Sequence, residues 1–115
     1  MHQAFLICPV RGHDPDEFAA VVAVLERRGW TVHFPPRDTN QEDATGLRIC
    51  ADNRAAIEAA ERVLVIWDGR SQGGLFDLGM AFALRKPVTV LELPAATEGK
   101  SYQNMIRAWA DTKEA

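Results

Sequence analysis

Short apolar segments alternate with longer segments of helical periodicity along this chain, and that alternation restricts its fold more than any other feature. Four strands are expected, at Ala4–Cys8, Thr31–Phe34, Arg62–Trp67 and Val88–Leu93. Strands separated by helices pair in parallel, because each crossover needs about a helix of chain. We therefore expect an α/β fold as one domain over residues 1–115, with helices on both faces of a parallel sheet.

The start and stop residues of the helices are also visible. Asp14, Pro15 and Glu17 predict a helix start, with the aspartate as N-cap and the proline at the first helical position, and Gly29 predicts its end. Further helices are expected from the apolar spacing of Leu47, Ile49, Ala56, Ile57 and Ala60, over Leu75–Leu84, and within Glu98–Ala110. The polar segment Arg37–Ala44 is expected to be a loop.

The shortest arrangement with this alternation is a flavodoxin-like or Rossmann-like three-layer sandwich. Its parallel sheet would have four to five strands in the order 2-1-3-4(-5). In such sheets the ligand lies beyond the carboxyl ends of the strands, where the direction of winding reverses. Here that point falls between the first and third strands. The loops Pro9–Asp14 and Asp68–Gly74 should therefore border a crevice.

Composition excludes several classes of function. The 115 residues carry a formal net charge of −3 and no run of Lys or Arg, so we expect no nucleic-acid partner. No apolar run approaches the ~20 residues of a membrane span, and the N-terminus lacks the features of a signal peptide, so we expect no membrane partner and a cytoplasmic location. Cys8 and Cys50 are interpreted as small buried hydrophobic residues, and the scattered histidines predict no metal site. No cofactor is expected.

The turn Ser71-Gln72-Gly73-Gly74 leads directly into the third expected helix. Free backbone N–H groups at a helix start, with Gly73 and Gly74 permitting close approach and a Ser71 hydroxyl beside them, would suit a phosphate or carboxylate. The alternative is an ordinary strand-to-helix turn, in which Ser71 caps the helix and the glycines give backbone freedom. The sequence leaves both open.

Asp77 is the only charged residue from Leu75 to Leu84, and we expect it in the first turn of that helix. An exposed acid there would complement the helix dipole by ~0.3–1 kcal/mol. A carboxylate among apolar neighbours should instead have a raised pKa or a partner, and can act as nucleophile or general acid/base. The apolar surroundings favour the second interpretation.

The Leu75–Leu84 helix has no polar stripe, so its outer face should also be covered. We expect a symmetric homodimer with this helix at or near the interface; the alternative is that the last helix alone covers it.

Other residues near the crevice have two interpretations each. Arg11, with Gly12 after it, could pair bidentately with an anion or be a solvated loop residue. Asp68 ends the third strand. Asn53 lies between Ile49 and Ile57, which turns it inward, where it needs hydrogen-bond partners or faces a ligand.

Four segments together resemble the nucleoside 2-deoxyribosyltransferase superfamily, which includes 2′-deoxynucleoside 5′-monophosphate N-glycosidases. They are AFLICPVRG, NRAAIEAAERVLVIWDG, SQGGLFDLGMAFALRKPV and NMIRAWA. The resemblance implies that Asp77 stands where the family keeps a catalytic glutamate, and Ser71 where monophosphate-specific members bind phosphate. It also implies that Arg11 and Gly12 line the sugar and phosphate, and that Asn53 stands where an aspartate usually holds the sugar and assists the leaving base.

Two positions depart from that pattern. Asp77 is one methylene shorter than glutamate, and a misplacement of ~1 Å can cost on the order of 100-fold in rate. Asn53 can hydrogen-bond a sugar but cannot exchange a proton at neutral pH, unless the pairing slips by one residue onto Asp52.

The sequence therefore predicts an enzyme, a hydrolase or transferase that acts on the N-glycosidic bond of a (deoxy)nucleotide or nucleoside. Its expected site residues are Asp77 and Asn53 for catalysis, and Arg11, Gly12, Asp68, Ser71, Gly73 and Gly74 for binding. The alternatives are a non-catalytic nucleotide-binding or sensing module with the same crevice, and an interaction domain without a small ligand. The sequence does not specify the base, the sugar or the acceptor.

Overall fold

The computed structural model describes residues 2–10, 12–14 and 16–110 and contains a parallel sheet of four strands. The strand order is β2-β1-β3-β4, as the sequence predicts, with no fifth strand among the described residues. The strands are β1 (His2–Ile7), β2 (Trp30–His33), β3 (Arg62–Ile66) and β4 (Val88–Glu92). The α/β class and the reversal of winding between β1 and β3 are therefore confirmed.

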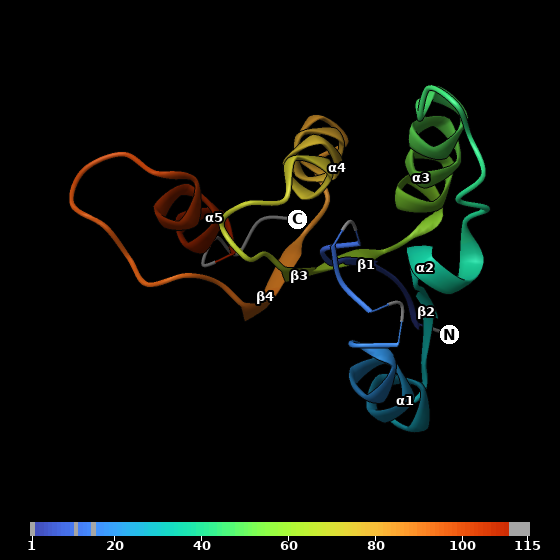
Figure 1. Ribbon diagram of the computed structural model, residues 1–115. Coiled ribbons are helices and arrows are strands. Elements are labelled where there is room, and N and C mark those ends of the chain that lie inside the picture. Colours follow the sequence, from blue (N-terminus) through green and yellow to red (C-terminus); the bar gives the residue numbers. More distant parts are fainter. Residues whose placement is uncertain (1, 11, 15, 111–115) are drawn as a thin grey trace.

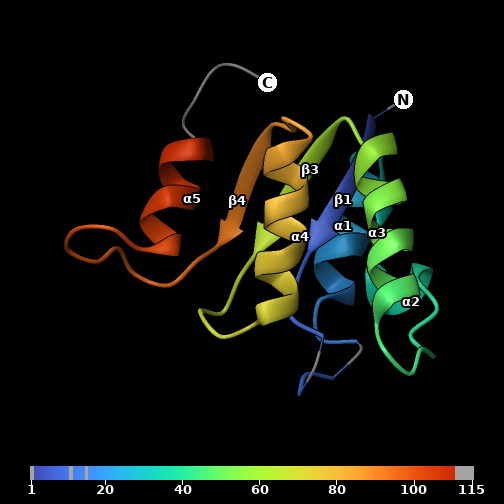
Figure 2. The ribbon, with the colours of Figure 1, turned by 90° about the horizontal axis from the view of Figure 1, so that it is seen from above.

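Helices cover both faces of the sheet (Figures 1 and 2). Helix α1 (Ala19–Arg27) lies on one face, and α3 (Leu47–Ala59) and α4 (Gln72–Ala83) lie on the other. Helix α5 (Tyr102–Ala110) lies beside β4, and the short helix α2 (Pro35–Asp38) follows β2. The result is the expected three-layer sandwich.

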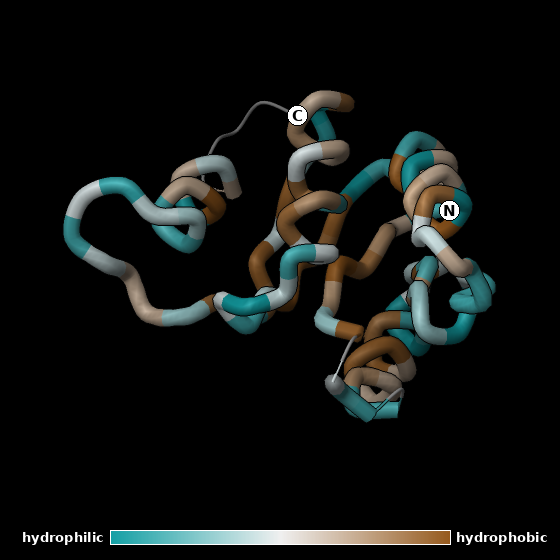
Figure 3. Tube along the Cα trace, turned by 45° about the horizontal axis from the view of Figure 1, so that its top comes forward, coloured by the Kyte–Doolittle hydropathy of each residue, from teal (hydrophilic) through white to brown (hydrophobic). Residues whose placement is uncertain are grey.

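Alternate side chains of each strand enter two separate cores, because successive residues of a strand point to opposite faces. In β1, Phe5 and Ile7 join the core under α3, α4 and α5, whereas Leu6 joins the core under α1. In Figure 3 the hydrophobic colours follow the central strands and the hydrophilic colours gather in the peripheral loops. Within the described ranges, no helix is both long and apolar enough to cross a bilayer.

Helix α1 begins later than the sequence predicts. The expected N-cap Asp14 instead forms a turn, in which its side chain accepts a hydrogen bond from the Asp16 backbone at 2.9 Å. The carboxylate of Glu17, which a capping box would fold back onto Asp14, is bound to His13 at 3.0 Å. Pro15 lies outside the described residues. Gly29 ends the helix as expected, with φ of 97°.

Two further boundaries also differ. Helix α2 includes the start of the segment expected to be a loop, because Pro35 starts a helical turn readily and Asp38 accepts a hydrogen bond from the Phe34 N–H at 2.8 Å. Helix α4 begins at Gln72, so Asp77 is its sixth residue and does not lie in the first turn. The dipole argument for Asp77 is therefore wrong, since that effect is confined to the first turn.

Candidate functional site

The loops after β1 and β3 meet at the carboxyl edge of the sheet, where the sequence predicts a crevice. His13, after β1, and Asp68, after β3, lie 3.2 Å apart between Nε2 and Oδ2. Gly12 precedes His13 with φ of 78°, a conformation that favours glycine. Arg11, an expected binding residue, lies outside the described residues.

Asp68 organises the second loop. Its Oδ1 accepts hydrogen bonds from the backbone N–H groups of Arg70 and Ser71, each at 2.8 Å. Burial raises the pKa of this carboxyl, but these bonds and the contact with His13 outweigh burial and lower it overall. The hydrogen bond to Glu17 raises the pKa of His13 against a smaller effect of burial, and Asp68 raises it further. The two loops are therefore tied together by the contact between His13 and Asp68.

Ser71 is the N-cap of α4, and its Oγ accepts a hydrogen bond from the Gly74 N–H at 3.0 Å. Its carbonyl oxygen accepts another from Trp67 Nε1 at 2.9 Å. A Cβ at Gly74 would lie 3.1 Å from the Trp67 ring, whereas a Cβ at Gly73 would meet open space. The capping interpretation of Ser71 is therefore correct, and the open surface at Gly73 leaves room for a ligand.

The carboxyl group of Asp77 is withdrawn from solvent between α3 and α4. Burial raises its pKa from 3.8 to about 7, although a hydrogen bond with the Asn53 side chain lowers it in part. The negative charge of Asp77 also acts on the thiols of Cys8, at the end of β1, and Cys50, on α3. None of the ion pairs between described residues involves Asp77. The sequence analysis expects a raised pKa or a partner for this carboxyl, and the structure has both.

Asn53 points inward from α3 and is 6% exposed. Its Oδ1 accepts a hydrogen bond from the Thr39 hydroxyl at 2.8 Å, and Thr39 Oγ1 lies 2.8 Å from His33 Nε2. The neighbouring Asp52 points outward and pairs with Arg48 at 2.7 Å. The residue that accompanies Asp77 is therefore the asparagine and not the adjacent acid.

Sequence reasoning missed His13, His33 and Thr39. His13 could have been found, because it precedes the first helix in a loop that must meet the end of the third strand. The other two carry no local signal: Thr39 lies in a polar segment, and its contact with Asn53 joins residues 14 apart. No group of three or more His, Cys, Asp or Glu within the described part of the chain could hold a metal ion.

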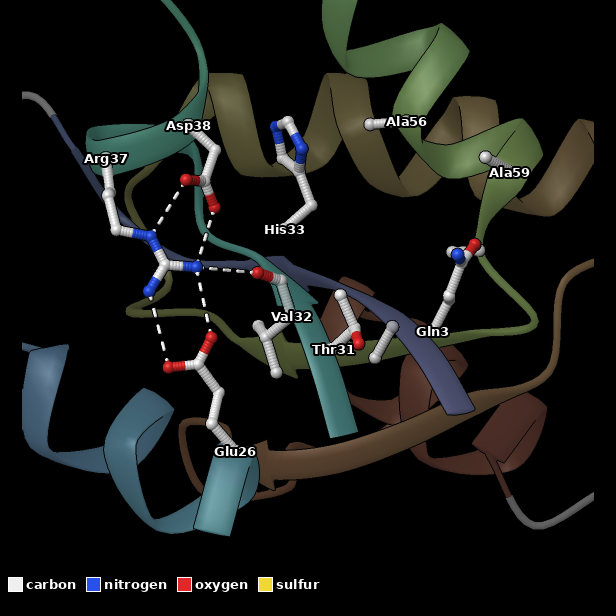
Figure 4. A pocket seen from close by; sticks show the side chains of 11 residues that line it. Gln3, Glu26, Thr31, Val32, His33, Arg37, Asp38, Ala56 and Ala59 are labelled. Atoms are coloured by element: carbon white, nitrogen blue, oxygen red, sulfur yellow. Dashed lines mark hydrogen bonds and ion pairs between the residues drawn. The ribbon is translucent and has the colours of Figure 1, made fainter. Parts of the chain in front are cut away.

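One surface hollow adjoins β2 and another lies between α1 and α2, and Asp77 lines neither. One lies between β2, α2 and α3 and is bordered by His33 (Figure 4). There Arg37 binds Glu26 and Asp38, at 3.3 and 2.8 Å. Because its hydrogen-bonding groups are occupied by acids and by the Val32 carbonyl, we interpret Arg37 as a structural clamp.

The outer face of α4 is apolar and open. Phe76 is 58% exposed, and Gly79 and Ala83 also face solvent. Phe82 has a partner in α5, because its ring lies edge-on to Trp109 with centroids 5.2 Å apart. Helix α5 therefore covers only part of this face.

Comparisons with known proteins show the family and the fold of this chain. The model of the family described as nucleoside 2-deoxyribosyltransferase matches residues 5–105. The 2-deoxyribosyltransferase of Bacillus psychrosaccharolyticus superposes with a TM-score of 0.72 at 19% identity, covering 93% of this chain and 81% of that one. The CMP N-glycosidase of Clostridium botulinum superposes with a TM-score of 0.60 at 19% identity, covering 95% and 83%. No curated protein sequence matches the chain.

Proposed function

This chain belongs to the nucleoside 2-deoxyribosyltransferase family, and we propose that it cleaves or exchanges the N-glycosidic bond of a nucleotide or nucleoside. One observation carries the proposal: the carboxyl group of Asp77 is largely withdrawn from water near Cys8, which follows β1, and its pKa is about 7. A carboxyl that titrates near neutral pH can act as nucleophile, base or acid in a glycosidic reaction.

In its ionised form Asp77 would attack or stabilise the anomeric carbon while the C–N bond to the base breaks. Asn53 presents its side chain to Asp77 and so fixes the position of the carboxylate. An amide neither takes up nor releases a proton at neutral pH, so the role of Asn53 is to orient the carboxylate and a sugar hydroxyl. The proton for the departing base would come from another group.

The turn before α4 would hold the phosphate or sugar. Gly73 lies open in the first turn of α4, two residues after the N-cap Ser71, whose hydroxyl hydrogen remains available for an anion. Arg11 and Gly12 would approach from the loop after β1. Asp68 would act indirectly, by fixing the loop through the Arg70 and Ser71 N–H groups.

The exposed face of α4 suits a second copy of the chain. Phe76, Gly79 and Ala83 give one large and two small apolar side chains along a single face, which allows two helices to approach closely. A homodimer through this face should be visible by sedimentation, and Phe76→Glu should convert it to a monomer. A wild-type protein that sediments as a monomer at high micromolar concentration would remove this part of the proposal.

A second candidate function is nucleotide binding without chemistry. Asn53 favours it, because the side chain beside Asp77 is an amide and not a second carboxyl that could exchange a proton with the leaving base. Such a module would bind the same anion at the α4 turn and release it unchanged. Calorimetric affinity for a nucleotide that remains intact would support this function over glycosidic cleavage.

Release of free base from a panel of deoxynucleoside and ribonucleoside monophosphates tests the main proposal. The wild type should release base from at least one of them, and Asp77→Ala should abolish the release. Asp52→Asn is the matched control, because Asp52 is the exposed acid on α3, and it should keep wild-type activity. Equal activity of wild type and Asp77→Ala would refute the proposal.

A further inference from the structure

The imidazole ring of His13 lies between two carboxylates, with one at each ring nitrogen. Nδ1 is 3.0 Å from Glu17 Oε1, and Nε2 is 3.2 Å from Asp68 Oδ2. Glu17 is four residues from His13 in the sequence, whereas Asp68 follows β3 and is 55 residues away. The contact with Asp68 therefore joins the loop after β1 to the loop after β3, and both loops leave the same edge of the parallel sheet (Figure 2).

The number of protons on this ring decides how many of the two contacts are hydrogen bonds. A carboxylate only accepts, and a neutral imidazole has one N–H, so a neutral His13 donates to only one of its partners. Its other nitrogen then turns a lone pair toward a negatively charged oxygen. The imidazolium has an N–H at each nitrogen and satisfies both carboxylates at once. The geometry around His13 is therefore that of the protonated ring.

We propose that His13 holds the two loops together only while its ring is protonated, which makes it a positioning residue for the turn before α4. When the ring loses its proton, one of the two contacts is given up. The bond with Glu17 is the shorter and spans four residues, whereas the bond with Asp68 has to hold two separate loops. The neutral ring should therefore keep its hydrogen on Nδ1, for Glu17, and release Asp68.

Asp68 carries the effect of this contact to the start of α4. Its Oδ2 faces His13, while its Oδ1 accepts hydrogen bonds from the backbone N–H groups of Arg70 and Ser71, each at 2.8 Å. Ser71 is the N-cap of α4, and its Oγ accepts a hydrogen bond from the Gly74 N–H at 3.0 Å. The proton on His13 thus acts on the carboxylate that fixes the loop leading into this turn.

The surroundings of His13 favour the protonated ring but leave it accessible to water. Glu17 and Asp68 are the charged groups that act on the ring, and the Phe18 ring lies beside it with centroids 6.0 Å apart. The hydrogen bond with Glu17 raises the pKa of His13, burial opposes this, and the hydrogen bond with Asp68 raises it further. The contact is therefore complete below the ordinary value of 6.5 and is lost as the pH rises through the raised value. Because the side chain is 25% exposed, water can replace it at Asp68.

The other two histidines have different surroundings and serve as internal references. His2 pairs with one carboxylate, with Nδ1 at 3.3 Å from Glu61 Oε1. His33 Nε2 lies 2.8 Å from the Thr39 hydroxyl oxygen, and burial lowers the pKa of His33. His13 should therefore titrate at a higher pH than His33.

Nitrogen-15 NMR of the whole protein tests the proposal without any ligand, because the two ring nitrogens of a histidine are distinct. The signals of His13 are assigned by their loss in His13→Ala. As the pH rises, the ring should change from the charged form to the Nδ1–H tautomer, and the amide signals of Arg70 and Ser71 should shift with the same midpoint. This shift of the amides should be absent in His13→Ala and should persist in Asp77→Asn, which separates it from the titration of Asp77.

Three further variants test whether the two carboxylates hold the charge on the ring. Asp68→Asn keeps an oxygen for the backbone N–H groups of its loop but removes the charge, and it should lower the His13 midpoint. Glu17→Gln should lower the midpoint as well, and His2→Gln, the matched control, should leave it unchanged. A His13 midpoint at or below that of His33, or loop amides that do not follow the titration of His13, would overturn the inference.

The link to ligand binding rests on the proposed function, and the two can fail separately. Affinity for the nucleoside monophosphates of the base-release assay is measured by calorimetry one pH unit below and two units above the His13 midpoint. Asp77→Ala is compared with Asp77→Ala/His13→Ala, so that turnover is absent and the titration of the ligand cancels between the two proteins. Loss of His13 should weaken binding about fivefold at the lower pH and less than about twofold at the higher pH.

The outcomes distinguish the two proposals. An affinity ratio that is the same at both pH values, with base release that needs Asp77, would refute the role of His13 and leave the proposed function in place. Loop amides that follow the titration of His13, in a protein that neither binds nor cleaves any of these nucleotides, would refute the proposed function alone.

Discussion

Replacing Asp77 with asparagine should stabilise the folded protein, and by more at high pH than at low pH. In the folded state burial raises the pKa of Asp77 from 3.8 to about 7, and the unfolded chain restores the ordinary value. Between these two values the folded protein holds a proton that the unfolded chain releases. The wild type therefore loses stability as the pH rises from about 4 to about 7, and the loss is complete above the folded pKa.

The magnitude follows from the size of the shift. One pKa unit corresponds to about 1.4 kcal/mol, so this group alone should cost the wild type about 2–3 kcal/mol between about pH 5 and pH 8. The Asp77 side chain keeps some contact with solvent, which screens its charge, and we expect about 2 kcal/mol. Asparagine removes the titration and retains a hydrogen-bonding partner for Asn53.

Urea unfolding of the wild type and Asp77→Asn at about pH 5 and pH 8 measures this effect. The difference in unfolding free energy between the two proteins should grow by about 2 kcal/mol in favour of the variant at the higher pH. Asp52→Asn makes the same chemical change at an exposed site and should follow the wild type at both values. A difference that changes by less than about 0.5 kcal/mol would refute the claim that Asp77 is desolvated.

Three further predictions concern the start of α4 and the end of α3. Gly74→Ala should lower the melting temperature, because its Cβ would lie 3.1 Å from the Trp67 ring, whereas Gly73→Ala has open space and should leave it unchanged or higher. Ser71→Ala should cost about 1 kcal/mol in urea unfolding through loss of the N-cap, and should weaken nucleotide affinity in calorimetry. Lys86→Gln should speed amide hydrogen exchange in the last turn of α3, since its Nζ donates to two carbonyls there; unchanged protection would contradict this role.

The architecture could be predicted because its signals are local. Val63–Trp67 is apolar because the observed strand β3 is buried on both faces from Val63 onward, and Gly29 marks the end of α1 because its φ is positive. The start of α1 could not be predicted in the same way. The capping pattern at Asp14 was outcompeted by a tertiary contact, since the Glu17 carboxylate binds His13, which in turn reaches Asp68 across the sheet edge.

Residues of the candidate site could also be predicted only where they leave a local signal in the sequence. Asp77 and Asn53 were found because a single acid in an apolar helix, and a single amide on an apolar face, break a periodic pattern. Leu47 shows the limit of that logic: it fits the apolar spacing of α3 but is 76% exposed at the start of the helix. Thr39 and His33 break no pattern, because polar residues at the end of a strand and after it are ordinary, and only the tertiary contact of this segment with α3 brings them to Asn53.

The buried polar residues of the described chain are neighbours in space. Among the described residues, the buried polar residues are Thr39 and Asn53, and they bind each other. Apolar residues there would avoid the cost of desolvating a hydroxyl and an amide. Asn53 lies beside Asp77, whose carboxyl pKa burial raises to about 7. On the other side of Asn53, Thr39 contacts His33. Stability alone does not explain this arrangement, whereas a need to fix the position of the Asp77 carboxyl would explain Asn53 beside it and Thr39 behind Asn53.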